Sequence, residues 1–424
     1  MLRHSPVDAG SLLEGGGQIL RLSLALAVIL GIEKLKIHNI RGKRRNPGMR
    51  PQHLKSVEAV ASFFKDGPSL IGAEPNSSEI EYTLQGSSGA KKSANSIQIN
   101  IGTAGSCTLL FQALLPCVLR ASQTEVSFDI RGGTDVPFAP PLDYLIYVFF
   151  PILEENFGIS CKIIKPVKRG YYPRGGGCLR INVTRFKTDH VPPFTKTDQG
   201  QICELHVFVH SSVSYEEART IAEQCSDRLL SSKVIVGKFK SSAPKVQITA
   251  TSDESSPSST KSTTTLTVVA ITSTKCRLGT SDLTQENMKL RDRQHEFIID
   301  RITDFENTIS SGATVDQHMA DQLILFLALA SGTSRLRIPE PISLHTITAM
   351  TIASKFLNRE MFGVADLFTV VCQPSQISDI PENDIKEIHF CHPKSDEIWE
   401  GSSDAKHATI VCEGASVLFP LGHE

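Results

Sequence analysis

The segment that decides the fold runs from Glu14 to Leu30 and reads EGGGQILRLSLALAVIL. After three glycines it is apolar on almost every side of a helix, with Gln18, Arg21 and Ser23 as exceptions. A surface helix keeps a polar face, so a helix of this kind must be buried on most sides. The apolar run is also too short to span a bilayer. The sequence therefore predicts a buried helix over Gln18–Leu30 within a globular core.

Two other segments repeat this pattern, Ser106–Leu119 and Met319–Ala330. Each of the three is followed by a short run with strand character and then, after a turn that contains proline, by a second helix. The strands are expected in LKIHNI (35–40), TEVSFDI (124–130) and SRLRIPE (334–340), and the second helices around Gln52–Phe64, Leu142–Phe157 and His345–Phe356. We therefore expect an α/β (α+β) fold of three repeated helix–strand–helix units, with β-sheets packed on helices.

The spacing of these units indicates an insertion. The first two begin roughly 90 residues apart and the last two roughly 210, a surplus of about one small domain. Residues 186–281 are predicted to form this small α/β domain, with strands at 203–210, 245–251 and 264–272 and a helix at Tyr215–Leu230. A Ser/Thr-rich tract near 252–265 is expected to be a disordered loop. Residues 1–185 and 282–424 would form the main domain, which is discontinuous in the sequence. The alternative is that the units are similar by chance.

Composition narrows the class of protein. The chain has 424 residues and a net charge of −1, so any contact with nucleic acid must come from a local basic patch. Its ten cysteines show no CxxC or zinc-ligand spacing, which favours reduced thiols in an intracellular protein. The first ten residues lack the apolar core of a secretory signal. We expect a soluble intracellular protein.

Two charged residues occupy positions where apolar ones are expected. Arg21 lies between Leu20 and Leu22 in the first buried helix, and Asp321 lies in the third. A buried charge must be paired or must face a bound ion. A structural salt bridge and an active-site role remain equally open for each residue.

Several turns have the composition of anion-binding loops. Residues 41–50 contain five basic residues and two glycines, and residues 168–177 combine basic residues with three successive glycines. A solvated basic loop or a localisation signal would explain the first, and a hairpin turn the second. Glu14 could be a hard-metal ligand or a helix N-terminal charge. His345 begins a predicted helix, where a capping or packing role is the default.

Taken together, these segments resemble the RNA 3′-terminal phosphate cyclase family. The matching motifs are EGGGQILR (14–21), IRGKR (40–44), PGMRPQHL (47–54), TAGSCTLLFQ (103–112), GGTDVPFAPP (132–141), RGYYPRGGG (169–177), DQL (321–323) and LHT (344–346). The resemblance covers about residues 8–185 and 310–356, and the insert only in outline. So many ordered motifs are not expected by chance.

The resemblance implies a reaction. His345 would attack the α-phosphorus of ATP, form a covalent histidine–AMP and release pyrophosphate. AMP would then pass to the 3′-phosphate of an RNA, giving an RNA(3′)pp(5′)A end. The neighbouring 2′-hydroxyl would finally attack that phosphorus, expel AMP and close a 2′,3′-cyclic phosphate.

The resemblance also implies roles for other residues. Arg21, Arg41 and Arg44 would hold phosphates, Glu14 would hold Mg²⁺ or Mn²⁺, Gln52 and Gln112 would be site amides, Pro140 would line the adenine pocket, and Asp321 would be an active-site carboxylate. His318 stands where the family usually has a tyrosine, and it is expected still to contact AMP. We expect Asp321 to orient His345.

Two other functions stay open at this stage. A cyclase-like branch of the superfamily lacks catalysis and serves in ribosome biogenesis, and it lacks the nucleophile that His345 would supply. A transferase acting on phosphorylated small molecules is the second alternative. The expected partner is an RNA 3′-phosphate end, with no membrane and no obligate protein partner. The resemblance implies a location in the nucleus, with the cytoplasm as the alternative. No role is predicted for the tail beyond about residue 368.

Overall fold

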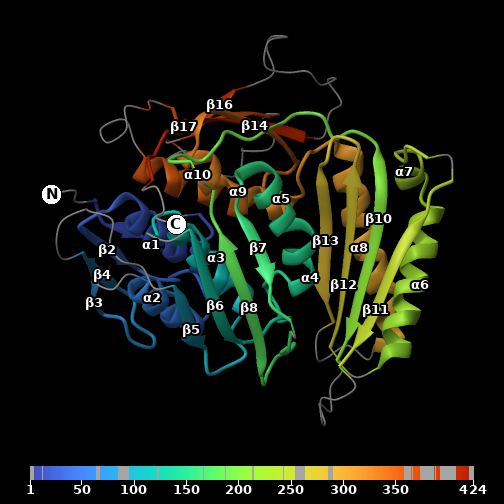
Figure 1. Ribbon diagram of the computed structural model, residues 1–424, viewed down its shortest axis with the longest axis horizontal. Helices are drawn as coiled ribbons and strands as arrows, with labels where there is room; N and C mark the ends of the chain where they lie inside the picture. The colour runs from blue at the N-terminus through green and yellow to red at the C-terminus, as the bar shows by residue number, and fades with distance from the viewer. Residues whose placement is uncertain are drawn as a thin grey trace.

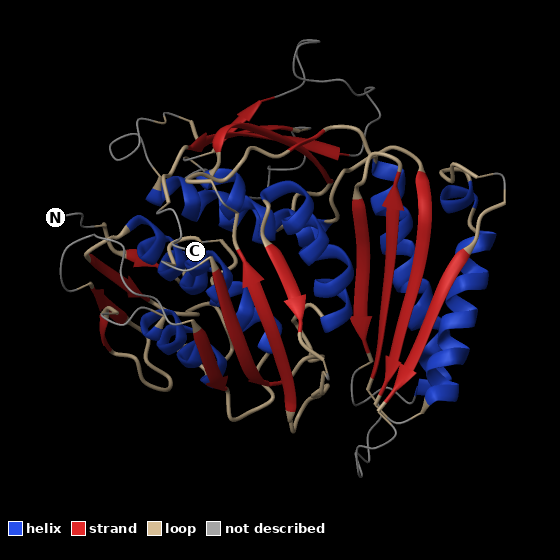
Figure 2. Ribbon diagram, viewed as in Figure 1, coloured by secondary structure: helices blue, strands red, loops and turns tan. Residues whose placement is uncertain are grey.

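A computed structural model of the protein describes residues 4–11, 13–63, 67–84, 95–121, 124–165, 167–186, 188–212, 214–241, 243–253, 263–284, 290–357, 364, 366–372, 386, 388–391 and 407–419, without the side chains of 290–293 and 391. The fold is mixed α/β, as expected, with helices packed against several β-sheets (Figures 1 and 2). Three of the sheets surround one group of helices, and the fourth belongs to the insert at the right of Figure 1.

The predicted apolar helices are confirmed. They are α1 (Gly17–Leu30), α3 (Cys107–Val118) and α9 (Gln317–Leu329), and the predicted second helices are α2 (Pro51–Ser62), the continuous series α4 (Leu142–Tyr144), η1 (Leu145–Phe149) and α5 (Phe150–Phe157), and α10 (Leu344–Phe356). In the main part, α1 packs against α2, α3 and α10, and α10 against α9. Their apolar side chains belong to one continuous core. The all-round apolar pattern predicted this burial correctly.

Three sheets enclose these helices (Figure 2). The first has the order β1 (Val7–Asp8), β2 (Lys34–His38), β4 (Ile80–Thr83), β3 (Ser69–Ile71), and the second β5 (Ser96–Asn100), β6 (Glu125–Gly132), β8 (Gly177–Thr184), β7 (Ser160–Ile163). The third has the order β16 (His389–Cys391), β15 (Phe368–Val371), β17 (His407–Ala415), β14 (Ser331–Pro339), β9 (Thr195–Lys196). The strands predicted after the three apolar helices are β2, β6 and β14.

The C-terminal tail has a structural role that the sequence did not reveal. Its strand β17 pairs antiparallel with β14 over nine residues, from Ser331↔Ala415 to Pro339↔His407. It also pairs with β15 and packs on α9. Strand β17 of the tail therefore lies at the centre of the third sheet.

The insert forms a sheet covered by helices on one face. Its strand order is β11 (Val246–Ser252), β10 (Ile202–Ser211), β12 (Thr264–Thr272), β13 (Arg277–Leu283), and α6 (Tyr215–Ser231), α7 (Lys233–Val236) and α8 (Leu290–Ser311) complete it. The three predicted strands and the helix at 215–230 are confirmed. Residues 252 and 264–265 of the predicted loop lie in strands, and residues 254–262 lie outside the described chain.

The edges of the insert differ from the predicted range of 186–281. Helix α8 lies beyond this range, yet its Phe297, Ile302 and Phe305 are buried in the insert's own core. Conversely, β9 lies inside the range but pairs with β14 of the main part. Packing therefore assigns α8 to the insert and β9 to the third sheet, while a division into independently folding domains stays a prediction.

A buried carboxylate joins the insert to the main part. Asp316 caps α9 by accepting from the backbone N–H of His318 and Met319, at 3.0 and 2.9 Å. It also accepts from the Tyr144 hydroxyl at 2.6 Å and from the Gly279 N–H of β13 at 2.9 Å. Burial raises the pKa of Asp316, although these donors work in the opposite direction. One side chain thus fixes three elements at the junction.

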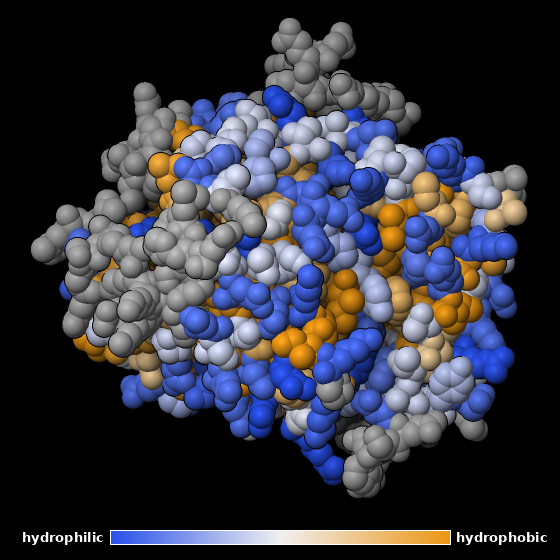
Figure 3. Space-filling view, in the orientation of Figure 1, coloured by the Kyte–Doolittle hydropathy of each residue, from blue (hydrophilic) through white to orange (hydrophobic). Residues whose placement is uncertain are grey.

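The described helices include none that is both long and apolar enough to cross a bilayer. Polar side chains cover most of the face drawn in Figure 3, and apolar ones form separate patches on it. The largest apolar faces of the fold lie inside it, in the two cores.

Removing the carboxylate of Asp316 tests this junction. We expect Asp316→Ala to lower the free energy of unfolding by about 3 kcal/mol, because a buried tyrosine hydroxyl and backbone N–H groups lose their acceptor. Urea unfolding would measure the loss. The exposed Asp227→Ala on α6 is the control, with a change of about 0.5 kcal/mol or less. Equal midpoints for the two variants would contradict the role of Asp316.

Candidate functional site

The site lies where three helices from distant parts of the chain meet. Gln18 and Arg21 come from the first turns of α1, and Asp321 comes from α9. His345 is in the first turn of α10, which begins where the Ser343 hydroxyl accepts from the Thr346 N–H at 3.1 Å. A small internal cavity of about 40 Å³ is lined by Gln18, Arg21, Gln112 and Asp321 among other residues. It has room for a water molecule or two but not for a nucleotide.

A chain of hydrogen bonds connects the buried carboxylate to the histidine. Gln18 donates its Nε2–H to Asp321 Oδ2 at 2.8 Å, which fixes the orientation of the amide. Gln18 Oε1 then lies 2.9 Å from His345 Nδ1. Because an amide oxygen can only accept, Nδ1 must carry the proton. The Nε2 of neutral His345 is therefore left with a free electron pair, on an exposed side chain.

Asp321 itself is held by two amides. Gln322 Nε2 donates to the same Oδ2 at 2.9 Å. Burial raises the pKa of Asp321, whereas His345, Gln322 and Arg21 lower it. The hydrogen bonds connect Asp321 to His345 through Gln18, a residue that sequence reasoning left out, and the orientation of His345 by Asp321 stays a prediction. The signal of Gln18 was a polar side chain at the start of a buried apolar helix.

Arg21 has no hydrogen-bond or ion-pair partner among the described residues. Burial lowers its pKa, while Glu14 and Asp321 raise it. Arg21 is one of the residues that line the cavity, and its guanidinium N–H groups are available to an anion.

Glu14 and Arg44 form an ion pair at the N-terminus of α1. Arg44 Nη2 lies 2.5 Å from Glu14 Oε2, and the Glu14 side chain is only 4% exposed. Glu14 Oε1 is buried and has no partner in the described structure. The close approach requires glycine at Gly16, where a Cβ atom would lie 2.2 Å from Glu14 Oε2 and 2.7 Å from Arg44 Nη2.

These observations test the predicted metal site. The described residues contain no group of three or more His, Cys, Asp or Glu side chains that could hold a metal ion. Glu14 nevertheless has one buried oxygen without a partner. Mg²⁺ commonly takes one or two carboxylates and completes its shell with water and substrate phosphates. Glu14 fits that kind of site and not a cage made by protein alone.

His53 is a second residue that sequence reasoning missed. Its Nδ1 accepts from the Arg50 backbone N–H at 3.3 Å, so its Nε2 carries the proton and can donate. A Cβ atom on Gly17 would lie 2.3 Å from His53 Nε2 and 3.2 Å from Arg21 Nη1, which places both side chains over this glycine. Burial, together with Arg21, Arg41 and Arg50, lowers the pKa of His53 to about 3. The only signal in the sequence was its place in PGMRPQHL.

The remaining predicted residues have the following positions. Arg41 Nη1 donates to the carbonyls of Asn46 and Gly48, at 2.7 and 2.9 Å, and so shapes the basic loop. Gln52 Oε1 accepts from the Ser106 N–H at 2.9 Å and joins α2 to α3. The Pro140 carbonyl accepts from Thr108 at 2.8 Å. His318 is exposed in the first turn of α9.

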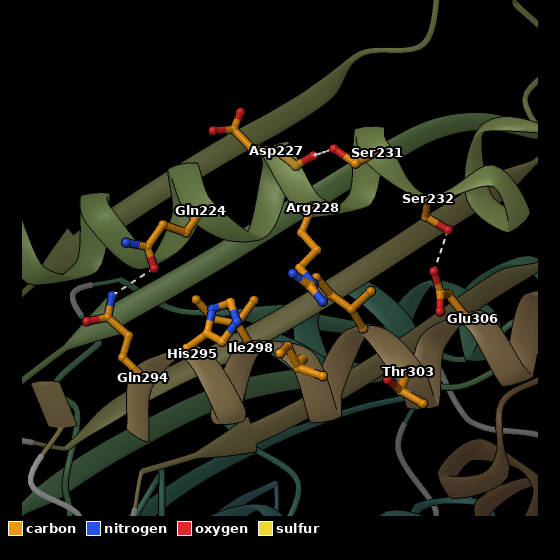
Figure 4. A pocket seen from close by; sticks show the side chains of 12 residues that line it. Gln224, Asp227, Arg228, Ser231, Ser232, Gln294, His295, Ile298, Thr303 and Glu306 are labelled. Carbon is orange, nitrogen blue, oxygen red and sulfur yellow. Dashed lines mark hydrogen bonds between the residues drawn. The ribbon is translucent and has the colours of Figure 1, made fainter. Parts of the chain in front are cut away.

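A larger groove lies elsewhere, between α6 and α8 of the insert (Figure 4). Its volume is about 700 Å³, and side chains of both helices face it, including Arg228, His295 and Ile298. Gln294 donates to Gln224 across it, and Ser232 to Glu306. It contains none of the residues predicted for the site, so size alone does not identify the site here.

The lowered pKa of His53 predicts an effect of pH on stability. Folded His53 stays neutral down to about pH 3, whereas unfolded histidine binds a proton below about pH 6.5. Stability should therefore fall as pH falls from 6.5 towards 3, by at most about 1.4 kcal/mol per pH unit from this residue. His53→Gln should remove that part of the slope. Urea unfolding at pH 7, 6 and 5 would measure it, and identical slopes would contradict the assignment.

The sequence is similar to a family of known proteins. The sequence model of a family described as RNA 3′-terminal phosphate cyclase matches residues 12–362. A protein of Desulfurococcus amylolyticus named RNA 3′-terminal phosphate cyclase is 33% identical over 347 residues, which are 82% of this chain and 90% of that protein. Proteins of the same name from Nitrosospira multiformis and Pyrococcus abyssi are 35% and 33% identical, over 82% and 87% of this chain and 90% and 96% of their own lengths.

The matched region includes every residue of the site described above, from Glu14 to His345. The chain belongs to the RNA 3′-terminal phosphate cyclase family.

Proposed function

We propose that the protein converts RNA 3′-phosphate ends to 2′,3′-cyclic phosphates with ATP, through a covalent adenylate on His345. The observation that carries this proposal is the hydrogen-bond chain from Asp321 through Gln18 to His345 Nδ1. In the neutral ring, which is exposed, this tautomer leaves Nε2 without a proton, as a nucleophile requires. Family membership supplies the substrate class.

In the first step His345 Nε2 attacks the α-phosphorus of ATP. An N–P bond forms, the bond from phosphorus to the bridging oxygen breaks, and pyrophosphate leaves with that electron pair. The imidazole becomes cationic, and Gln18 Oε1, backed by Asp321, accepts the Nδ1–H more strongly in that state. The N-terminus of α10, which carries His345, favours the negative charge of the reacting phosphates.

Three groups of this chain would bind the phosphates. In the described part of the chain the N–H groups of Arg21 have no partner, and His53 offers a neutral Nε2–H beside them. Arg44 is tied to Glu14 but is about half exposed. Guanidinium groups suit phosphate oxygens because they donate in pairs and keep their charge. Arg41 would act by holding the loop that carries Arg44, since its Nη1 is engaged by loop carbonyls.

Glu14 would hold Mg²⁺ or Mn²⁺ together with the phosphates, and the ion would neutralise part of their charge. Gln112 and Pro140 would border the nucleotide, as would His318 in place of the family tyrosine.

In the second step an oxygen of the RNA 3′-phosphate attacks the same phosphorus. The N–P bond breaks, His345 recovers its electron pair, and AMP is now joined to the RNA end. In the third step the 2′-oxygen attacks the RNA phosphorus, its proton is lost to solvent or base, and AMP leaves. Because this attack is intramolecular, positioning can supply much of the acceleration.

The alternative role, in ribosome biogenesis without catalysis, is disfavoured by His345 and by the residues that orient it. From the sequence pattern we also propose that the three helix–strand–helix units are internal repeats. From the resemblance we propose that the protein acts in the nucleus, with the cytoplasm as the alternative, and we infer no obligate protein partner.

Covalent adenylylation can be tested directly. Wild-type protein with ATP labelled in the α-phosphate should form an acid-labile, alkali-stable adduct, as expected of a phosphoramidate. His345→Ala should abolish the adduct with little change in stability, because the side chain is exposed. His295→Ala, in the groove of the insert, is the matched control and should label normally. Normal labelling of His345→Ala would refute the proposed nucleophile.

Substrate chemistry gives a second test. RNA with a 3′-phosphate should be activated and cyclised, whereas RNA with a 3′-hydroxyl should not be activated. An oligonucleotide ending in a 2′-deoxy 3′-phosphate should accept AMP and then stall, because the attacking 2′-hydroxyl is missing. Mass analysis of the products would decide. Ring closure without a 2′-hydroxyl would overturn the mechanism.

A further inference from the structure

Phe138 stands out among the apolar side chains of the described chain. It is 96% exposed, more than any other large apolar residue described, and it lies in the loop between β6 and α4. Its backbone has a φ of 62°, in the left-handed region. A bulky residue in this region is a conformational outlier, with a cost of about 1–3 kcal/mol.

Folding does not account for this residue. The ring buries no area, so it contributes nothing to the core, and glycine or asparagine would adopt the same backbone conformation at lower cost. Strained residues of this kind persist where the surrounding structure holds them, and they concentrate at ligand sites.

The surrounding structure does hold this loop. Buried Asp135 accepts from Arg169 Nη1 at 3.0 Å and from the Leu142 N–H at 3.3 Å. Val136 is buried at one side of Phe138, and Pro140 is bound by Thr108 at the other. The ring is therefore presented to solvent by a fixed segment and not by a loose one.

The loop borders the candidate site. Thr108, which binds the Pro140 carbonyl, lies one turn before Gln112 in α3, and that turn is about 6 Å long. Gln112 lines the same cavity as Arg21 and Asp321. Phe138 is two residues from Pro140, a span of at most about 7 Å. It therefore lies at the rim of the site, facing outwards.

We propose that Phe138 stacks on a base of the RNA within two nucleotides of its 3′ end. This inference rests on the proposed function. An RNA whose terminal phosphate is held among the arginines must run out of the site across its rim, where its bases are unpaired. Each base offers a π-face, so stacking on an exposed aromatic ring needs no particular sequence.

Kinetics can separate this role from nucleotide binding. We expect Phe138→Ala to raise the KM for RNA about 5- to 150-fold, the range for loss of one stacked base. Adenylylation by ATP alone should be unchanged, and Phe138→Tyr should restore RNA binding. Ile71→Ala is the matched control, because Ile71 is also exposed (68%) but lies on β3. A loss of adenylylation in Phe138→Ala would overturn the proposal, because the ring would then serve ATP.

An abasic substrate identifies the partner of the ring. Two RNAs are compared, one abasic at the terminal position and one abasic at the penultimate position. Wild-type protein should bind one of them more weakly than intact RNA. At that position the effect of Phe138→Ala should vanish, since the stack is already lost. Equal effects of the mutation on intact RNA and on both abasic RNAs would refute stacking.

Fluorescence anisotropy can measure the binding of RNA 3′-phosphate without ATP. This measurement tests the stacking by Phe138 independently of the proposed reaction. If wild-type protein forms no adenylate, the proposed function fails, while the anisotropy comparison of wild type with Phe138→Ala still decides the stacking.

Discussion

The structure depends on one constraint: helices that are apolar all round have to be buried all round. Helices α1, α3 and α9 satisfy it by packing in the middle of the main part, with sheets outside them. The same burial makes the few polar side chains on these helices costly unless they find partners. Gln18 and Asp321, 303 residues apart in sequence, satisfy each other across the helix interface. The candidate site is thus formed by the few polar side chains on helices that are otherwise apolar.

The sequence predicted the helices of the main part and the strands after them because their patterns are strong and local. It did not predict α8, whose 22 residues mix charged and apolar side chains as surface helices do. It also placed β9 in the insert, because a pairing with β14 is set by contacts far along the chain. The local sequence pattern determines whether a segment is a helix or a strand. Long-range packing determines whether that helix or strand belongs to the insert or to the main part.

For the site, sequence motifs named most of the residues that the fold brings together, including His345, Asp321 and Arg21. They did not reveal that Gln18 connects two of them or that His53 lies against Gly17. Uncharged amides and a histidine that follows a basic loop have no distinctive pattern, and their roles come from geometry. For Arg41 the motif suggested a role that the geometry does not show. The resemblance assigns its guanidinium to phosphate, but in the structure the guanidinium donates to carbonyl groups of its own loop.

The place of β17 in the third sheet has a consequence for synthesis. Helix α9, which carries Asp321, packs on β17, and β14 between α9 and α10 is paired with it along nine residues. Domains begin to fold while the ribosome is still working. The nascent chain, however, carries His345 and Asp321 out of the ribosome well before residues 407–415 exist. Chains that end before residue 407 would therefore contain the full set of reactive side chains but lack the strand that pairs with β14 and packs on α9.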